Sequence, residues 1–324
     1  MTRHLAALGV LAGLWLALAV LTALATALIW PRLAFALRAA RPELRARLAW
    51  LAAVGPVAIP TALTLLCTLP GLVGALAGVG DHCIAHGDHP HFCPIHATAP
   101  LTPWVVTSLF ACTAILAALA HVSFSAIRTE RRETRWLARR RSDRVASDVR
   151  LLDTHEPIAL THGLHAPAIW IARPLHEALS DEERVVVFAH ERAHAERRDP
   201  ARLLAASIAS RLHLPAMRRR LLFDLRLASE QACDAQAARR VGDPLRVADA
   251  LLHVERLMRG IASPLPSATA LVDTSLPARI EALLGAGTIP PRPCAERETA
   301  GFSPPPRSCS RARSTTSRST CSKS

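Results

Sequence analysis

Three long apolar runs within the first 126 residues limit the possible folds of this chain more than any other feature. Residues 5–30 carry no charged side chain, and two further runs follow at about 48–69 and 101–126. A membrane-spanning helix needs about 20 such residues. A cleaved signal peptide is the alternative for the first run, but this run is longer than a usual signal core. The sequence therefore predicts a three-helix membrane domain over residues 1–127.

The charge pattern predicts how these helices cross the membrane. The formal net charge is +13, and arginines gather after the first and third apolar runs, whereas residues 81–100 contain no Lys or Arg. Because Lys and Arg flank spans on the cytoplasmic side, the N-terminus and residues 81–100 should lie outside the inner membrane. Everything after residue 128 should be cytoplasmic, beginning with a basic juxtamembrane segment, 128–148, that we expect to be helical as far as 144 and to contact anionic lipids. No nucleic-acid motif accompanies the charge, so direct nucleic-acid binding is not expected.

The remainder of the chain predicts a mixed α+β domain over residues 149–284. Short strands are expected at 149–152, 157–160 and 168–172, the last of them bounded by prolines. From residue 179 onward the pattern is helical. Residues 285–324 are rich in Pro, Ser and Arg and lack an apolar period, so this tail is expected to be disordered.

One helix carries a pattern typical of a metal centre. Ser180 and Glu183 form a capping box at its start, and His190, Glu191 and His194 follow as His-Glu-x-x-His. Since residues four apart share a helix face, the two histidines can bind one zinc ion, which lowers the pKa of a water molecule to about 7. Glu191 would take the proton of that water and pass it to the leaving amine. A chance match of this short motif is the alternative.

A second helix, predicted at 222–240, supplies a candidate third metal ligand. A catalytic zinc ion usually has three protein ligands and one open position. Glu230 is the candidate, and Asp234 shares its face and would orient a ligating histidine. The alternative is a pair of surface acids on an arginine-rich helix.

These motifs together resemble the MecR/BlaR-type integral membrane zinc metallopeptidases. The resemblance rests on residues 190–194, 197–200 and 229–234, with 170–175 and 277–280 on either side. It implies a cytoplasmic gluzincin-like (zincin) domain and Zn²⁺-dependent proteolytic signalling, with a protein or peptide substrate such as a transcriptional repressor. It also implies that a substrate strand pairs with a sheet edge beside the metal helix, for which 168–172 is the candidate. HtpX-like quality-control membrane proteases share the zinc motif and are the alternative.

The chain departs from that family after residue 280. Family members commonly have a fourth span there, and some then carry an extracellular penicillin-binding sensor, whereas this chain continues as a polar tail. The β-lactam-sensing role therefore does not carry over. A natural truncation and a shifted reading frame both remain open as explanations of the tail.

The predicted outer loop is dense in metal-binding side chains. In an oxidising compartment its two cysteines can form a disulfide, which would leave the histidines solvated. Alternatively, thiols and imidazoles together suit zinc or copper, as in a metal or redox sensor. The residues concerned are Cys83, Cys93, His86, His89, His91 and His96.

Three functions are therefore weighed. The leading hypothesis is a membrane zinc endopeptidase that cleaves a cytoplasmic or membrane-near protein in regulatory proteolysis. The second is a non-proteolytic transmembrane metal or redox sensor whose zinc site is structural. The third is a basic membrane scaffold in which the motif occurs by chance.

Overall fold

The computed structural model describes residues 2–77, 100–258 and 275–286. Most of the predicted outer loop, 81–99, lies outside these residues, and so do its two cysteines and four candidate histidines. The predicted tail beyond residue 286 also lies outside them. The alternatives stated for the loop and the tail therefore stay predictions.

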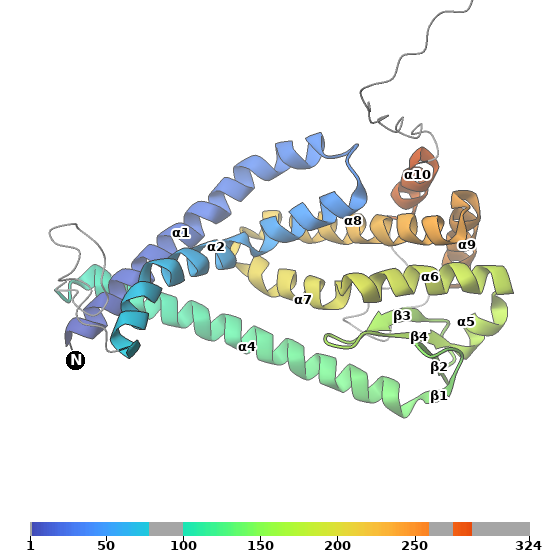
Figure 1. Cartoon of the computed structure of the whole chain (residues 1–324), viewed down its shortest axis with the longest axis horizontal. Coiled ribbons are helices and arrows are strands. Elements are labelled where there is room, and N and C mark those ends of the chain that lie inside the picture. Colours follow the sequence, from blue (N-terminus) through green and yellow to red (C-terminus); the bar gives the residue numbers. More distant parts are fainter. Residues whose placement is uncertain (1, 78–99, 259–274, 287–324) are drawn as a thin grey trace, which may run out of the picture. The chain divides into compact units, whose positions relative to one another are not determined.

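Three long helices contain the predicted spans: α1 (Thr2–Ala36), α2 (Pro42–Ala77) and α4 (Pro103–Arg139) (Figure 1). Each is long and apolar enough to cross a membrane. Large apolar side chains are exposed on all three, among them Leu28, Leu66 and Phe110. Exposed apolar surface of this extent is unusual in a soluble protein and suggests a membrane protein.

Glycine permits a close crossing of α1 and α4. A Cβ atom added to Gly9 would lie 2.6 Å from the carbonyl oxygen of Val105, and one added to Gly13 would lie 3.2 Å from the hydroxyl of Ser108. Gly9 and Gly13 are one helical turn apart on α1, and small residues at this spacing let membrane helices pack backbone to backbone.

All three helices extend beyond their predicted spans, and α1 and α2 also pack on the rest of the chain. Ala46, Ala49 and Ala53 of α2 are buried in one apolar cluster with residues of α8 (Pro215–Val241). In addition, the Trp30 indole donates a hydrogen bond to the Asp224 carboxylate at 2.8 Å. The predicted membrane helices and the helix that carries Glu230 therefore share a core.

A four-stranded sheet follows α4. Its strands are β1 (Arg141–Arg144), β2 (Val149–Leu152), β3 (Ala159–His162) and β4 (Ala168–Ala172), in the order β1-β2-β4-β3. β2 and β4 are parallel, and the two outer strands are antiparallel to their neighbours. The strands predicted at 149–152 and 168–172 are confirmed, while the strand predicted at 157–160 lies two residues later.

Two expectations about this region are wrong. The basic helix predicted as far as 144 ends at Arg139, because Arg141–Arg144 pairs with β2 as a strand instead. The segment 168–172 is not a sheet edge, because β4 forms hydrogen bonds with β2 on one side and with β3 on the other. The edge strand beside the helix of the His-Glu-x-x-His motif is β3.

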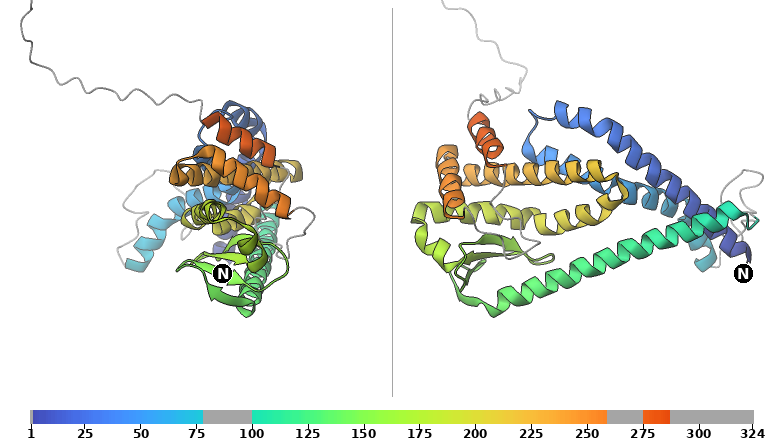
Figure 2. Two further views of the ribbon diagram at one scale, coloured as in Figure 1. Left: turned by 90° about the vertical axis from the view of Figure 1, so that its right-hand side faces the viewer. Right: turned by 180° about the vertical axis from the view of Figure 1, so that it is seen from behind.

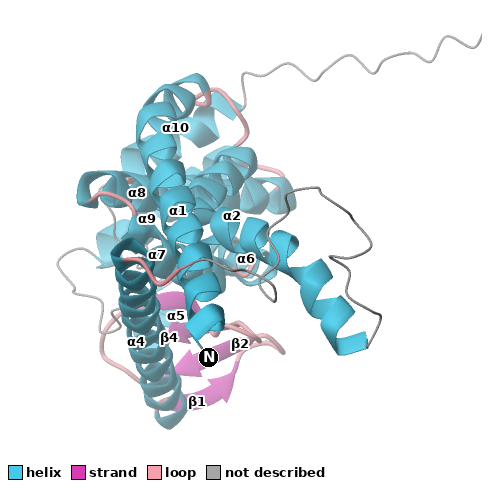
Figure 3. Ribbon diagram, turned by 90° about the vertical axis from the view of Figure 1, so that its left-hand side faces the viewer, coloured by secondary structure: helices cyan, strands magenta, loops and turns pink. Residues whose placement is uncertain are grey.

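The sheet lies between that helix, α6 (Asp181–Arg197), and the end of α4 (Figures 1 and 2). Successive residues of a strand point to opposite faces. Ala159 of β3 therefore belongs to the core under α6, whereas Leu160 packs with Leu137 of α4. Figure 3 shows the strands grouped beside α4. This alternation directs the next two residues of β3, Thr161 and His162, to opposite faces of the sheet.

Helices complete the described chain. A short helix, α5 (Arg173–Ala178), leads from the sheet to α6. After α6 come α7 (Asp199–Ala209), a 3-10 turn (Ser210–Leu212), α8, α9 (Pro244–Met258) and α10 (Leu276–Ala286). α8 ends at Val241, and the residue after it, Gly242, caps the helix with a φ of 79°, a conformation that favours glycine.

Candidate metal centre

The helix of the motif begins as its sequence predicts. The Ser180 amide donates to the Glu183 carboxylate at 2.8 Å, and the Glu183 amide donates to the Ser180 hydroxyl at 3.3 Å, which completes the capping box. The helix ends where Arg198 adopts the left-handed conformation with φ 54°. This break turns the chain back, so that Asp199, the first residue of α7, reaches the side chain of His194.

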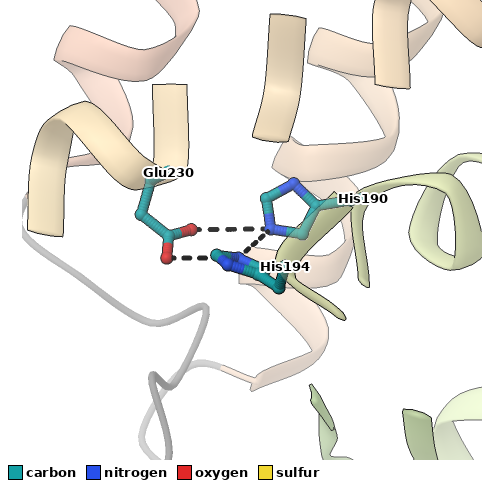
Figure 4. A group of neighbouring side chains, drawn as sticks. All are labelled: His190, His194 and Glu230. Atoms are coloured by element: carbon teal, nitrogen blue, oxygen red, sulfur yellow. Dashed lines mark hydrogen bonds and ion pairs between the residues drawn. The ribbon is translucent and has the colours of Figure 1, made fainter. Parts of the chain in front are cut away.

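His190, His194 and Glu230 converge in the protein interior (Figure 4). The Nε2 atoms of the two histidines are 3.1 Å apart, and each lies 3.5 Å from a different oxygen of Glu230. A tetrahedral ion with bonds of about 2.1 Å holds its ligand atoms about 3.4 Å apart. The two nitrogens and the carboxylate therefore lie close to the spacing that one such ion requires, and one ligand atom of each residue lies within 4.8 Å of the others. The residues come together although 198–214 separate α6 from α8.

Each histidine has an aspartate at its other ring nitrogen. Asp234 lies 2.9 Å from Nδ1 of His190, and Asp199 lies 3.0 Å from Nδ1 of His194. A carboxylate at this position fixes the tautomer and turns Nε2 toward the metal. The sequence predicted a role of this kind for Asp234. It gave no role to Asp199, although this residue follows the cap residue Arg198 and precedes Pro200.

A buried arginine joins the two acids of α8. Arg279 of α10 is 1% exposed, and its Nε and Nη2 atoms each donate to an oxygen of Asp234 at 2.7 Å. Its Nη1 atom lies 3.2 Å from the Glu230 carboxylate. Sequence analysis identified Arg279 only within a family motif and gave it no role, because its partners are about 45 positions earlier in the chain.

The pKa values show a centre of opposed charges. Burial alone would raise the pKa of Glu230, but Arg279 and His194 outweigh it and hold that pKa well below its usual value. Burial would lower the pKa of both histidines, but Asp234 and Glu230 raise that of His190. Cys233, Glu230 and Asp199 together bring the pKa of His194 well above its usual value. Without a metal ion the site therefore favours protonated imidazoles beside ionised acids, and a cation has to displace those protons.

A thiol completes the surroundings of His194. The Cys233 sulfur lies 3.3 Å from Nδ1 of His194 and 3.6 Å from Asp199. Burial raises the pKa of Cys233 to about 11, so the thiol is protonated at neutral pH. Cys233 therefore acts as a small buried side chain that packs against the aspartate-histidine pair.

Glu191 is buried on the same helix and is held from the sheet. The Thr161 hydroxyl on β3 lies 2.7 Å from Oε2 of Glu191 and 2.8 Å from the Glu191 carbonyl oxygen. Such a contact fixes the direction of the carboxylate without neutralising it. Thr161 was not singled out from the sequence, because a lone threonine in a strand gives no signal of this role.

The wall beside His190 is apolar. A small cavity there is lined by Val186, Val187 and His190 of α6 and by Ala250, Leu251 and Val254 of α9. Apolar walls lower the local dielectric constant and so strengthen the electrostatic interactions of the site.

Two histidines one helical turn apart, a glutamate from a second helix and a further buried glutamate are the residue types that metallopeptidases use as metal ligands and general base. Residues 132–263 match the model of Peptidase family M48, a stretch that includes the last turns of α4, the sheet and α5 to α9. This match supports a metallopeptidase of that family. No curated protein and no solved structure matches the chain.

Proposed function

We propose that this chain is a membrane-anchored zinc endopeptidase. His190, His194 and Glu230 would hold the ion, and Glu191 would act as the general base. The observation that carries the proposal is the convergence of these three side chains in a buried site. The two Nε2 atoms are 3.1 Å apart, and each lies 3.5 Å from one of the two Glu230 oxygens. Three helices able to cross a membrane and the match to a metallopeptidase family support the class of the enzyme.

The residues divide the work of peptide hydrolysis. A bound zinc ion would lower the pKa of the attacking water and polarise the scissile carbonyl group. Glu191, held by Thr161, would accept the proton of that water and deliver it to the leaving amine. Asp234 and Asp199 would keep the two imidazoles in the ligating tautomer.

The sheet edge indicates how a substrate would bind. β3 is the outer strand on the side of α6, and Thr161 within it contacts Glu191. An extended peptide that adds to β3 as a further strand would pass directly beside the metal ligands. This geometry favours an unfolded or extended segment of a protein as the substrate.

The arginine pattern supports a cytoplasmic catalytic domain in the inner membrane, because arginines follow the first and third apolar runs. A protein near the cytoplasmic face would then be the substrate. A transcriptional repressor, as in MecR/BlaR-type signalling, is the leading candidate. Quality control of membrane proteins, as for HtpX-like proteases, is the alternative. A sensor with a structural zinc site would bind the ion without cleaving anything.

The test measures zinc content and peptide cleavage together on the detergent-purified chain. The wild type is expected to hold about one zinc ion at this centre. His190→Ala and Glu230→Ala should each lose it, whereas Glu191→Gln should keep the zinc and lose cleavage. Glu177→Gln, on the exposed surface of α5, serves as the matched control and should change neither.

Each outcome discriminates. If the wild type shows no zinc-dependent cleavage of casein but holds zinc, the sensor alternative is favoured. If Glu230→Ala keeps its zinc, Glu230 is not the third ligand. If the wild type binds no zinc, the endopeptidase proposal is wrong.

A further inference from the structure

A second cluster of metal-binding side chains lies on the opposite face of the sheet from the centre described above. Glu130 and Glu133 of α4 and His162 of β3 place one donor atom each within 4.8 Å of one another. Nε2 of His162 lies 3.2 Å from Glu130, and its Nδ1 lies 3.9 Å from Glu133. The Thr134 hydroxyl is a fourth polar atom, 3.0 Å from Nε2.

The position of this cluster in the fold brings its members together. Glu130 and Glu133 are three residues apart and therefore share a helix face, beyond the apolar part of α4. His162 and Glu133 are buried, and Glu130 is nearly so. Two carboxylates this close repel each other, and burial adds a desolvation cost to each charge. A divalent cation between them would offset both effects.

The donor set fits a transition metal. Two carboxylates and one imidazole suit cations such as Mn²⁺, Fe²⁺ or Zn²⁺, with the remaining positions filled by water or by a hydroxyl group. Burial lowers the pKa of His162, so its imidazole is neutral at pH 7 and has a lone pair to offer. The two glutamates at i and i+3 and a histidine from a separate element bring one ligand atom each within 4.8 Å of one another, close enough for a single ion.

We propose that Glu130, Glu133 and His162 form a second divalent-metal site, distinct from the peptidase centre. An ion there would tie α4, the third candidate membrane helix, to β3, the edge strand of the sheet. Thr161, the residue next to His162, contacts Glu191 on the other face. Occupancy of the site would therefore fix the strand that holds the proposed general base.

The experiment measures Mn²⁺ binding to the full-length, metal-free protein in detergent. Free aqueous Mn²⁺ gives an electron paramagnetic resonance signal that is lost on binding, so a titration counts the bound ions. Glu130→Gln, Glu133→Gln and His162→Gln should each bind one ion fewer than the wild type, or bind that ion at least tenfold more weakly. Ions at the peptidase centre or elsewhere are common to all these proteins and cancel in the comparison.

His165→Gln is the matched control, because this histidine is exposed in the turn that follows β3. It should bind as many ions as the wild type. Melting temperatures in chelator show which variants fold, and Glu130→Gln, at the most exposed of the three ligands, is the variant expected to disturb the fold least. Added Mn²⁺ should raise the melting temperature of the wild type more than that of this variant.

Two results would overturn the proposal. One is a wild type that binds no more Mn²⁺ than the three variants do, which would make the cluster a hydrogen-bonded junction only. The other is an equal Mn²⁺-dependent rise in melting temperature for the wild type and Glu130→Gln. Either result leaves the proposed peptidase centre untouched, since none of its ligands is altered.

Discussion

The sharpest test of the metal centre is the substitution Asp234→Asn, which keeps the shape of the side chain and removes its charge. Asp234 is not one of the three proposed ligands. It lies 2.9 Å from Nδ1 of His190 and accepts two hydrogen bonds at 2.7 Å from Arg279. An asparagine has one carbonyl oxygen in place of two carboxylate oxygens, so its NH₂ group would face either the imidazole N–H or a guanidinium N–H. The substitution therefore weakens the support of His190 and leaves a buried donor without an acceptor.

The magnitude follows from the position of Asp234 behind a ligand. Loss of such a carboxylate typically lowers metal affinity about 10- to 100-fold, which corresponds to about 1.4 to 2.7 kcal/mol. Asp199→Asn should have a similar effect, because Asp199 supports His194 at the same distance, within 0.1 Å. If the two effects were independent, the double variant would lose about 100- to 10,000-fold, or about 2.7 to 5.5 kcal/mol.

Competition with a chromogenic zinc chelator measures these affinities on the folded protein in detergent. Asp153→Asn is the matched control, since this acid pairs with Arg173 at the surface and should leave the affinity unchanged. An Asp234→Asn variant that binds zinc within twofold of the wild type would refute the reasoning, and so would an equal loss in the control. If Asp234→Asn loses zinc affinity and Asp199→Asn does not, the contact between Asp199 and His194 does not support the metal.

Three further predictions concern charge, pH and packing. Arg279→Met should destabilise the metal-free protein by about 3 to 5 kcal/mol, because it removes the buried guanidinium that pairs with both carboxylates. A melting temperature equal to that of the wild type would contradict this. Since the folded-state pKa values of His190 and His194 are raised, zinc binding at pH 7 should release protons, and zinc affinity should fall with falling pH. Calorimetry in buffers of different ionisation enthalpy measures the number of protons released. Zinc binding without proton release would contradict this prediction. In the metal-free protein the same charge pairs stabilise the fold below a pH of about 6.5, and this contribution is lost as the pH rises through the raised values. Gly9→Ala should lower the free energy of unfolding by about 1 to 3 kcal/mol, because its Cβ atom would lie 2.6 Å from a carbonyl oxygen of α4. Gly55→Ala is the control and should be tolerated, because the nearest atom to its Cβ lies at 3.8 Å. Equal melting temperatures of the two variants would refute this prediction.

Much of the centre was accessible from the sequence because it depends on local geometry. The His-Glu-x-x-His spacing defines a helix face wherever the helix lies, and the capping box at Ser180 and Glu183 is formed within four residues. Glu230 and Asp234 share a face of α8 for the same reason. The apolar runs likewise predicted α1, α2 and α4, since the length of such a run is a property of the sequence alone.

The strands were less accessible because pairing depends on distant partners. The sequence located β2 and β4 from their apolar residues, yet it did not show that β4 has neighbours on both sides. It also predicted a helix where Arg141–Arg144 forms β1. That prediction failed because hydrogen bonds to β2 outweigh the helical pattern of the preceding residues. Which strand forms the edge is decided only when the whole sheet is assembled.

The sequence by itself determined which residues can bind a metal ion and on which helices they lie. Only the tertiary structure decided what surrounds them: Asp199 behind His194, Arg279 between Glu230 and Asp234, and Thr161 against Glu191. It also brought His162 to the carboxylates of α4. The physical reason is that helical periodicity acts over four residues, whereas the charge and hydrogen-bond partners of a buried group come from any part of the chain that packs against it.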